Sequence, residues 1–182
     1  MTNTEILTAV NQITRRAETS IDDYLIQSAQ EISRRKACLA EEATGNTVAN
    51  VSYIDKPADL VILNNVVIDG VSYDPITFDE YLNDILNGVC LRGDYIYIRP
   101  TPATVAAYTV YYRKEHPASA TILLPDIFKQ GIIHYVAARV YQKYEINDKG
   151  DEQLKFYEYE LAKANLPEIP LVCKPRKTNC RI

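Results

Sequence analysis

The residues of this 182-residue chain that could act as nucleophiles, bases or soft metal ligands are four cysteines and two histidines. The cysteines are Cys38, Cys90, Cys173 and Cys180. Zinc sites draw on closely spaced ligand pairs such as CxxC, and no two of these cysteines have that spacing. We therefore expect no zinc site, and we interpret the cysteines as scattered reduced thiols of a cytosolic product.

The two histidines lie in settings that favour a structural role. His116 precedes Pro117 at the end of a predicted strand, so we interpret it as a loop residue. His134 lies between Ile133 and Tyr135 on a predicted helix, as a packed or surface residue. A Cys/His dyad would need a nucleophilic cysteine near one of them in space, which the sequence leaves open.

The acidic pairs and the glycines also do not form the sequence patterns of metal-binding, phosphate-binding or catalytic sites. Asp22 and Asp23 suit the first turn of a helix, Glu41 and Glu42 lie at a strand end, and no second acidic cluster suggests a metal cage. The chain has six glycines, none in a phosphate-loop spacing, and it contains neither GxSxG nor HExxH. The sequence thus predicts no catalytic, cofactor-binding or metal-binding residues.

Composition narrows the remaining classes of function. The net charge of −4 does not indicate the excess of basic residues that is typical of nucleic-acid-binding proteins. No apolar run approaches the ~18 residues of a membrane span, and the first residues carry no basic start or apolar signal core, so we expect no membrane anchoring and no secretion. The chain has 14 Tyr, 3 Phe and no Trp, which is typical of a half-buried, tyrosine-rich sheet with some contribution to interfaces.

Helical periodicity predicts two helices within residues 4–36, capped by Thr2 or Asn3 and by Thr19-Ser20, which should pair as an antiparallel hairpin. It returns within residues 125–164, where Pro125 opens a helix. The run Asn147-Asp148-Lys149-Gly150 should break it, so that a final helix starts at Asp151.

Residues 37–122 show short apolar runs separated by Gly, Asn, Asp and Pro. The predicted strands are Cys38 to Glu42, Thr47 to Tyr53, Leu60 to Leu63, Val66 to Ile68, Tyr95 to Arg99 and Tyr108 to Arg113. Asn64-Asn65 and Asp69-Gly70 are predicted tight turns, and Thr77 with Glu80 forms a capping-box pattern for a short helical turn.

The sequence therefore predicts an α+β fold: an antiparallel bundle of two N-terminal and two C-terminal helices, with an inserted small antiparallel β region and an extended C-terminal tail. Residues 1–165 would form one domain. Residues 166–182 contain three prolines and four basic residues against a single Glu168, so we expect an extended segment rather than a helix.

Several local patterns carry a resemblance that spans about residues 4 to 165. The most specific is Tyr97-Ile98-Arg99-Pro100-Thr101-Pro102 followed by Tyr108-Thr109-Val110-Tyr111-Tyr112-Arg113. Further patterns are Lys56-Pro57-Ala58-Asp59-Leu60, Val67-Ile68-Asp69-Gly70, Leu124-Pro125-Asp126, Ala137-Ala138 and Tyr157-Glu158. With these patterns in this order, the chain resembles the head-tail connector proteins of tailed bacteriophages, the adaptor or head-completion class. It departs from them in lacking the tryptophan often found near the end of the second helix.

The resemblance implies a structural, non-enzymatic subunit of the virion neck, synthesised in the host bacterial cytoplasm. Its partners would be the portal protein, neighbouring copies in a ring (commonly of twelve), a downstream neck or tail protein, and genomic DNA that passes through the channel without sequence-specific binding. It also implies that the C-terminal segment docks on the portal. The residues expected to do so are Leu166, Ile169, Leu171, Val172, Lys174, Arg176, Lys177 and Arg181.

Three alternatives remain open from the sequence. The chain could be another neck or tail component, such as a stopper or a tail terminator, although those proteins tend to be β-dominated. It could be a cytosolic enzyme of unrecognised type, which would need a polar pocket with perturbed titratable groups. It could bind DNA through the C-terminal segment alone, but four basic residues give only weak, salt-sensitive affinity.

Overall fold

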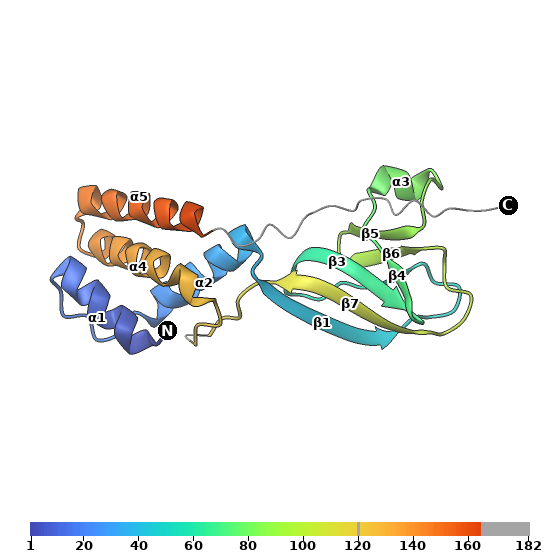
Figure 1. Cartoon of the computed structure of the whole chain (residues 1–182), viewed down its shortest axis with the longest axis horizontal. Coiled ribbons are helices and arrows are strands. Elements are labelled where there is room, and N and C mark those ends of the chain that lie inside the picture. Colours follow the sequence, from blue (N-terminus) through green and yellow to red (C-terminus); the bar gives the residue numbers. More distant parts are fainter. Residues whose placement is uncertain (120, 165–182) are drawn as a thin grey trace. The chain divides into compact units, whose positions relative to one another are not determined.

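The computed structural model describes residues 1–119 and 121–164 (Figure 1). The order of elements is helices, strands, helices, as the sequence predicts for an α+β fold. The described residues form two compact units. The helical unit comprises residues 1–41, 59–62 and 113–164, and the β unit comprises residues 42–58 and 63–112.

The helical unit contains four principal helices: α1 (Asn3–Thr14), α2 (Asp22–Lys36), α4 (Lys129–Lys143) and α5 (Asn147–Lys163). A 3₁₀ turn, Asp126–Phe128, leads into α4. The packing differs from the predicted N-terminal hairpin, because α1 and α2 pack chiefly against α4 rather than against one another. Helix α4 also has the most buried residues of the four, nine, which agrees with its central place.

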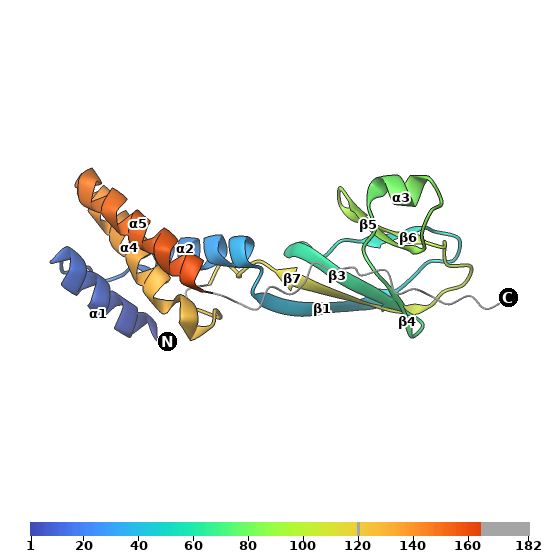
Figure 2. The ribbon, with the colours of Figure 1, turned by 45° about the horizontal axis from the view of Figure 1, so that its top comes forward.

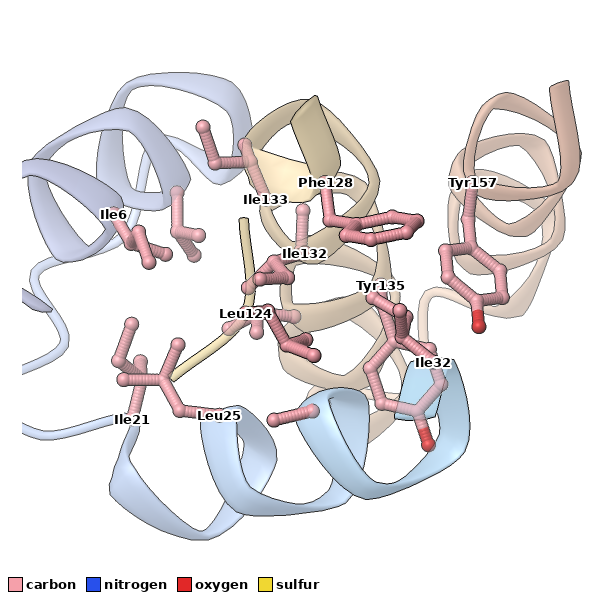
Figure 3. Packing of buried hydrophobic residues seen from close by; sticks show 14 of the residues in the cluster. Ile6, Ile21, Leu25, Ile32, Leu124, Phe128, Ile132, Ile133, Tyr135 and Tyr157 are labelled. Atoms are coloured by element: carbon pink, nitrogen blue, oxygen red, sulfur yellow. The ribbon is translucent and has the colours of Figure 1, made fainter. Parts of the chain in front are cut away.

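The core of this unit forms where the apolar faces of the four helices meet (Figure 3). Ile6, Leu25, Ile32 and Ile132 are fully buried there, and Phe128 on the 3₁₀ turn fills the space beside them. Tyr135 of α4 and Tyr157 of α5 close one side of the cluster, with ring centroids 5.3 Å apart in an edge-to-face arrangement. Burial of this apolar surface is the main force that holds the helices together.

The N-terminal residues of α1 and α2 stabilise the starts of these helices largely as predicted. Thr2 caps α1 in a full capping box with Glu5. Asp22 and Asp23 occupy the first turn of α2, and its last turn is basic, which matches the helix dipole at both ends. The predicted cap of α2 at Thr19-Ser20 is confirmed only in part: Ile21 is the N-cap and makes no side-chain capping bond, but Ser20 Oγ accepts from the Asp22 backbone N–H over 3.4 Å.

The predicted break at residues 147–150 is also wrong, since α5 already begins at Asn147. The chain reverses earlier, at Glu145, which has a φ of 59°. Gly150 is buried inside α5, and a Cβ there would lie 3.2 Å from Gln142 Cγ of α4. The lack of a side chain at Gly150 therefore lets α5 approach α4 closely, and the residue does not form a turn.

The β unit contains most of two sheets and a short helix, α3 (Phe78–Leu82) (Figure 2). One sheet has the order β1-β7-β3-β4, built from Leu39–Asn46, Ala107–Lys114, Leu60–Ile68 and Val71–Tyr73. The other has the order β2-β6-β5, built from Tyr53–Asp55, Tyr95–Arg99 and Gly88–Arg92. The division between the two units falls within β1, β3 and β7.

Several predicted strands and turns need correction. Asn64-Asn65 is not a turn, because β3 runs unbroken from Leu60 to Ile68 between two neighbouring strands. Across this pairing, Asn65 Nδ2 donates to Ser72 Oγ of β4 over 3.0 Å. The predicted turn at Asp69-Gly70 is confirmed: both residues have positive φ, and β3 and β4 pair antiparallel on either side of it.

Residues 47–52 were predicted as strand but lie in a connecting segment. There Thr47 is buried and exchanges bonds with Ala106: its backbone N–H donates to the Ala106 carbonyl, and its hydroxyl accepts from the Ala106 N–H over 2.9 Å. Strand β5 was not predicted at all. The tyrosine-rich strands β6 and β7, joined by Pro100-Thr101-Pro102, belong to different sheets.

Candidate interaction surface

Alternation along the three-stranded sheet separates its isoleucines from its tyrosines. Ile54, Ile96 and Ile98 are buried on one face. Because successive residues of a strand point to opposite faces, Tyr53, Tyr95 and Tyr97 lie on the other. The antiparallel register of β2 and β6 sets Tyr53 opposite Tyr97 and Asp55 opposite Tyr95, which brings the three rings together.

The rings form a continuous cluster that extends onto α3. Tyr53 contacts Tyr95 with centroids 4.8 Å apart, and Tyr97 contacts Tyr81 at 5.8 Å. Phe78 stacks on Tyr81 at 6.4 Å. Helix α3 begins with a capping box, in which Thr77 and Glu80 bond reciprocally as the sequence predicts. We call this set, Tyr53, Phe78, Tyr81, Tyr95 and Tyr97, the tyrosine face.

Two arginines border the tyrosine face. The Arg92 guanidinium lies 4.1 Å from the Phe78 ring centroid, and that of Arg99 lies 5.1 Å from the Tyr81 centroid. Arg99 also pairs with Asp84, which has a φ of 55° in the turn after α3. The Arg99 Nη1 atom is buried without a hydrogen-bond partner. Such an unpaired buried donor lowers the stability of the fold.

Much of this region is open to solvent. Tyr53 and Tyr95 are 43% and 40% exposed, and Leu82, Ile85 and Leu86 are exposed in the turn after α3. Clusters of exposed tyrosine, arginine and aliphatic side chains are typical of protein–protein interfaces, where aromatic residues and arginine are enriched. The tyrosine face is therefore the candidate interaction surface among the described residues. Sequence reasoning recognised Tyr95 and Tyr97 as strand residues, but Phe78 and Tyr81 join them only in the fold.

The histidines and cysteines, which could act as bases or nucleophiles, have structural roles in the described part of the chain. His116 is 1% exposed, and both of its ring nitrogens contact backbone atoms: Nε2 accepts from the Leu123 N–H over 3.0 Å, and Nδ1 lies 2.8 Å from the Pro117 carbonyl oxygen. Its own N–H donates to Ser33 Oγ over 2.8 Å. His116 is thus a loop residue, as predicted, and it joins the end of β7 to the segment before α4.

The remaining candidates lack the surroundings that activate such groups. His134 bonds Gln153 through Nδ1, at 2.8 Å, between α4 and α5. Burial raises the pKa of the thiols of Cys38 and Cys90, which disfavours the nucleophilic thiolate. Across residues 1–119 and 121–164, no group of three or more His, Cys, Asp or Glu side chains could hold a metal ion.

The predicted portal-docking residues, Leu166, Ile169, Leu171, Val172, Lys174, Arg176, Lys177 and Arg181, lie outside the described residues. Their role therefore stays a prediction. Among the helices that the structure describes, none has the length and apolar character to cross a bilayer.

The sequence patterns and the helix–strand–helix order agree with a comparison of the whole chain with known families. A family model of the SU10 adaptor proteins matches residues 1–172, which includes both units. No curated protein matches the chain significantly. On this match the chain belongs to the SU10 adaptor protein family, a structural family of phage neck adaptors.

Proposed function

We propose that this chain is the repeating subunit of an adaptor ring that docks beneath the phage portal and joins the DNA-filled head to the tail. The observation that carries the proposal is the family match over residues 1–172, with the same order of elements as the connector proteins that the sequence resembles. The structure adds a helical unit with a well-packed core and a β unit with an exposed aromatic surface. Both are suited to assembly.

In the proposed ring, each subunit contacts two neighbours through heterologous interfaces, and rotation by a fixed angle closes the circle. We infer twelve copies from the connector proteins that the chain resembles. A downstream neck or tail protein would bind the opposite side of the ring. Genomic DNA would pass through the centre without sequence-specific binding, which agrees with the net charge of −4.

The C-terminal segment is the proposed portal-docking element. Leu166, Ile169, Leu171 and Val172 would anchor it in a groove of the portal, and its basic residues would aid encounter and orientation. Prolines restrict the backbone before binding, so less entropy is lost when the segment docks.

The direct test combines the purified protein with its portal. Electron microscopy should show a ring of this protein under the portal, and light scattering should show oligomers only when both are present. A chain ending at Asn165 should unfold at nearly the same temperature but fail to bind the portal. Reversal of the charge of the four basic residues in the full chain should weaken binding more at low salt than at high salt. A stable dimer that never binds the portal would contradict the ring, and normal assembly of the truncated chain would exclude the segment as the docking element.

A further inference from the structure

Two rings of the tyrosine face are covered by arginines of the β unit itself. The Arg92 guanidinium lies 4.1 Å from the Phe78 ring centroid. The Arg99 guanidinium lies 5.1 Å from the Tyr81 centroid and also pairs with the Asp84 carboxylate. At Tyr81 the face thus combines an aromatic ring, a guanidinium and a carboxylate, an arrangement in which a cation is attracted by both neighbours.

Tyr53 and Tyr95 have the ring and the carboxylate of this arrangement. Their ring centroids are 4.8 Å apart, and both side chains are exposed. The register of β2 and β6 sets Asp55 directly opposite Tyr95, and Asp55 lies on the same sheet face as Tyr53, two residues before it. Within residues 1–119 and 121–164, no arginine or lysine lies over either ring. The described residues therefore leave this position without its cation.

The charges of the β unit favour a positively charged partner. Its described residues carry eight acidic and three basic side chains, a net charge of −5. Two of the basic side chains, Arg92 and Arg99, already lie over rings. The third, Lys56, follows Asp55, and strand alternation directs it to the opposite side of the sheet. The Lys56 N–H donates to the Asp94 carbonyl over 2.9 Å, so Asp94 adds an exposed carboxylate at the same end of the strands.

The geometry of the position favours arginine over lysine. A guanidinium is planar, so it can stack on a ring while its N–H groups bond a carboxylate in parallel. An ammonium is compact and strongly hydrated, and it cannot make both contacts in this way. Exposed tyrosine and arginine are also enriched where proteins bind one another, so a protein surface is the expected source of the cation.

We propose that Tyr53, Tyr95 and Asp55 form a docking site for an arginine side chain presented by a partner protein. The guanidinium stacks on a ring and bonds the Asp55 carboxylate, and the negative β unit attracts the positive surface around that arginine. Under the proposed function, the partner is another protein of the neck. The site itself belongs to the isolated subunit, so a test on that subunit can refute it without refuting the adaptor ring.

Titration of the full-length protein with blocked tripeptides tests the site. The probes are Gly-Arg-Gly, Gly-Lys-Gly and Gly-citrulline-Gly, which offer a planar cation, a compact cation and a planar neutral group. NMR of ring-labelled tyrosine follows Tyr53 and Tyr95, assigned with Tyr53→Phe and Tyr95→Phe, and Tyr111, an exposed tyrosine outside the face, is the reference. The arginine peptide should shift the Tyr53 and Tyr95 resonances saturably at millimolar concentrations, at least about fivefold more tightly than the other peptides. The Tyr111 resonance should not shift.

Four variants, each checked for folding by circular dichroism, locate the binding. Asp55→Asn should weaken binding of the arginine peptide at least about fivefold. Asp69→Asn removes the same charge from an exposed position in the turn between β3 and β4, and it should leave binding unchanged. Tyr95→Leu should weaken binding, whereas Tyr95→Phe should retain it, because the ring and not the hydroxyl attracts the cation.

Several results would overturn the proposal. Equal binding of the three peptides would show that neither charge nor planarity is recognised, and equal loss in Asp55→Asn and Asp69→Asn would show that only net charge matters. Absence of saturable shifts would mean that the rings do not accept a guanidinium. If the Tyr53 and Tyr95 resonances changed with protein concentration alone, a second copy would fill the site and the assignment to a partner protein would be wrong.

Discussion

The Tyr157 hydroxyl offers a quantitative test of the packing of the helical unit. Tyr157 lies on α5, is 2% exposed and packs edge-to-face on Tyr135. Its hydroxyl oxygen is buried and makes no hydrogen bond of good geometry, although the Arg35 guanidinium lies close by. A buried polar group that loses its bonds with water and gains none in the protein lowers stability by about 1–3 kcal/mol.

The change Tyr157→Phe removes that hydroxyl and keeps the ring and its contact with Tyr135. We expect the free energy of unfolding at pH 7 to rise by about 1 kcal/mol, the lower end of this range, because the space left by the oxygen stays unfilled. Urea denaturation followed by circular dichroism at 222 nm measures it, since the signal comes mainly from the helices. A matched control is Tyr141→Phe, because the Tyr141 hydroxyl donates to the Ile13 carbonyl over 2.9 Å, and its removal should lower stability by about 1 kcal/mol.

The same substitution should change the pH dependence of stability. Burial raises the pKa of Tyr157 from 10.0 to about 12, although the nearby Arg35 guanidinium opposes the shift. Between these values the unfolded chain loses the phenolic proton while the folded protein retains it, so stability falls as the pH rises. The tyrosine protein should lose up to about 1.4 kcal/mol relative to Tyr157→Phe between pH 9 and pH 11. Lysines and the other tyrosines titrate in both proteins and cancel in the difference.

Two results would refute this account of Tyr157. If Tyr157→Phe destabilised the protein as much as Tyr141→Phe does, the hydroxyl would have a partner in solution. If the difference between Tyr157→Phe and the unaltered protein stayed constant from pH 9 to pH 11, burial would not hold the phenol in its neutral form.

Further expectations concern glycines, His116 and metal content. Gly131→Ala in α4 should stabilise the protein by about 0.5–1 kcal/mol in urea denaturation, because the new Cβ would lie 3.7 Å from Tyr157 Cδ2, an ordinary contact. Gly88→Ala should destabilise it by more than about 1 kcal/mol, because the Cβ would lie 2.6 Å from the Asp74 carbonyl oxygen; an unchanged denaturation midpoint would contradict that geometry. His116→Ala should lower stability by about 2–3 kcal/mol, since it leaves the Leu123 N–H without its acceptor and opens a cavity. Elemental analysis of protein purified without added metal should find no stoichiometric zinc or iron, and a one-to-one content would overturn that expectation.

Features with a local physical cause could be read from the sequence. The capping box of Thr77 and Glu80 involves residues three apart, so its pattern predicts the start of α3, and of the two caps predicted for the first helix, Thr2 or Asn3, the structure shows Thr2. The strand from Tyr95 to Arg99 was predicted with its observed bounds, because alternation marks its length and Pro100 ends it. The α+β order followed from the same local periodicities, and the family resemblance came from short motifs within these elements.

Features that depend on distant partners could not be read in this way. Asn64-Asn65 has the composition of a turn, but strands on both sides of β3 hold it extended. Gly150 has the composition of a break, but the approach of α5 to α4 uses its missing side chain inside a helix. Strand β5 was not predicted from the sequence, and the structure defines it through its pairing with β6.

The sequence by itself determined the class of fold, the positions of most helices, the absence of recognisable catalytic motifs and the family resemblance. Each rests on residues close together in the chain, where capping, periodicity and proline geometry act without tertiary contacts. The tertiary structure decided that α4 is the central helix, that the strands divide into two sheets, and that Phe78 and Tyr81 join Tyr53, Tyr95 and Tyr97. These outcomes depend on which apolar faces bury one another across long separations in sequence, and a one-residue change in register would send the tyrosines to the buried side.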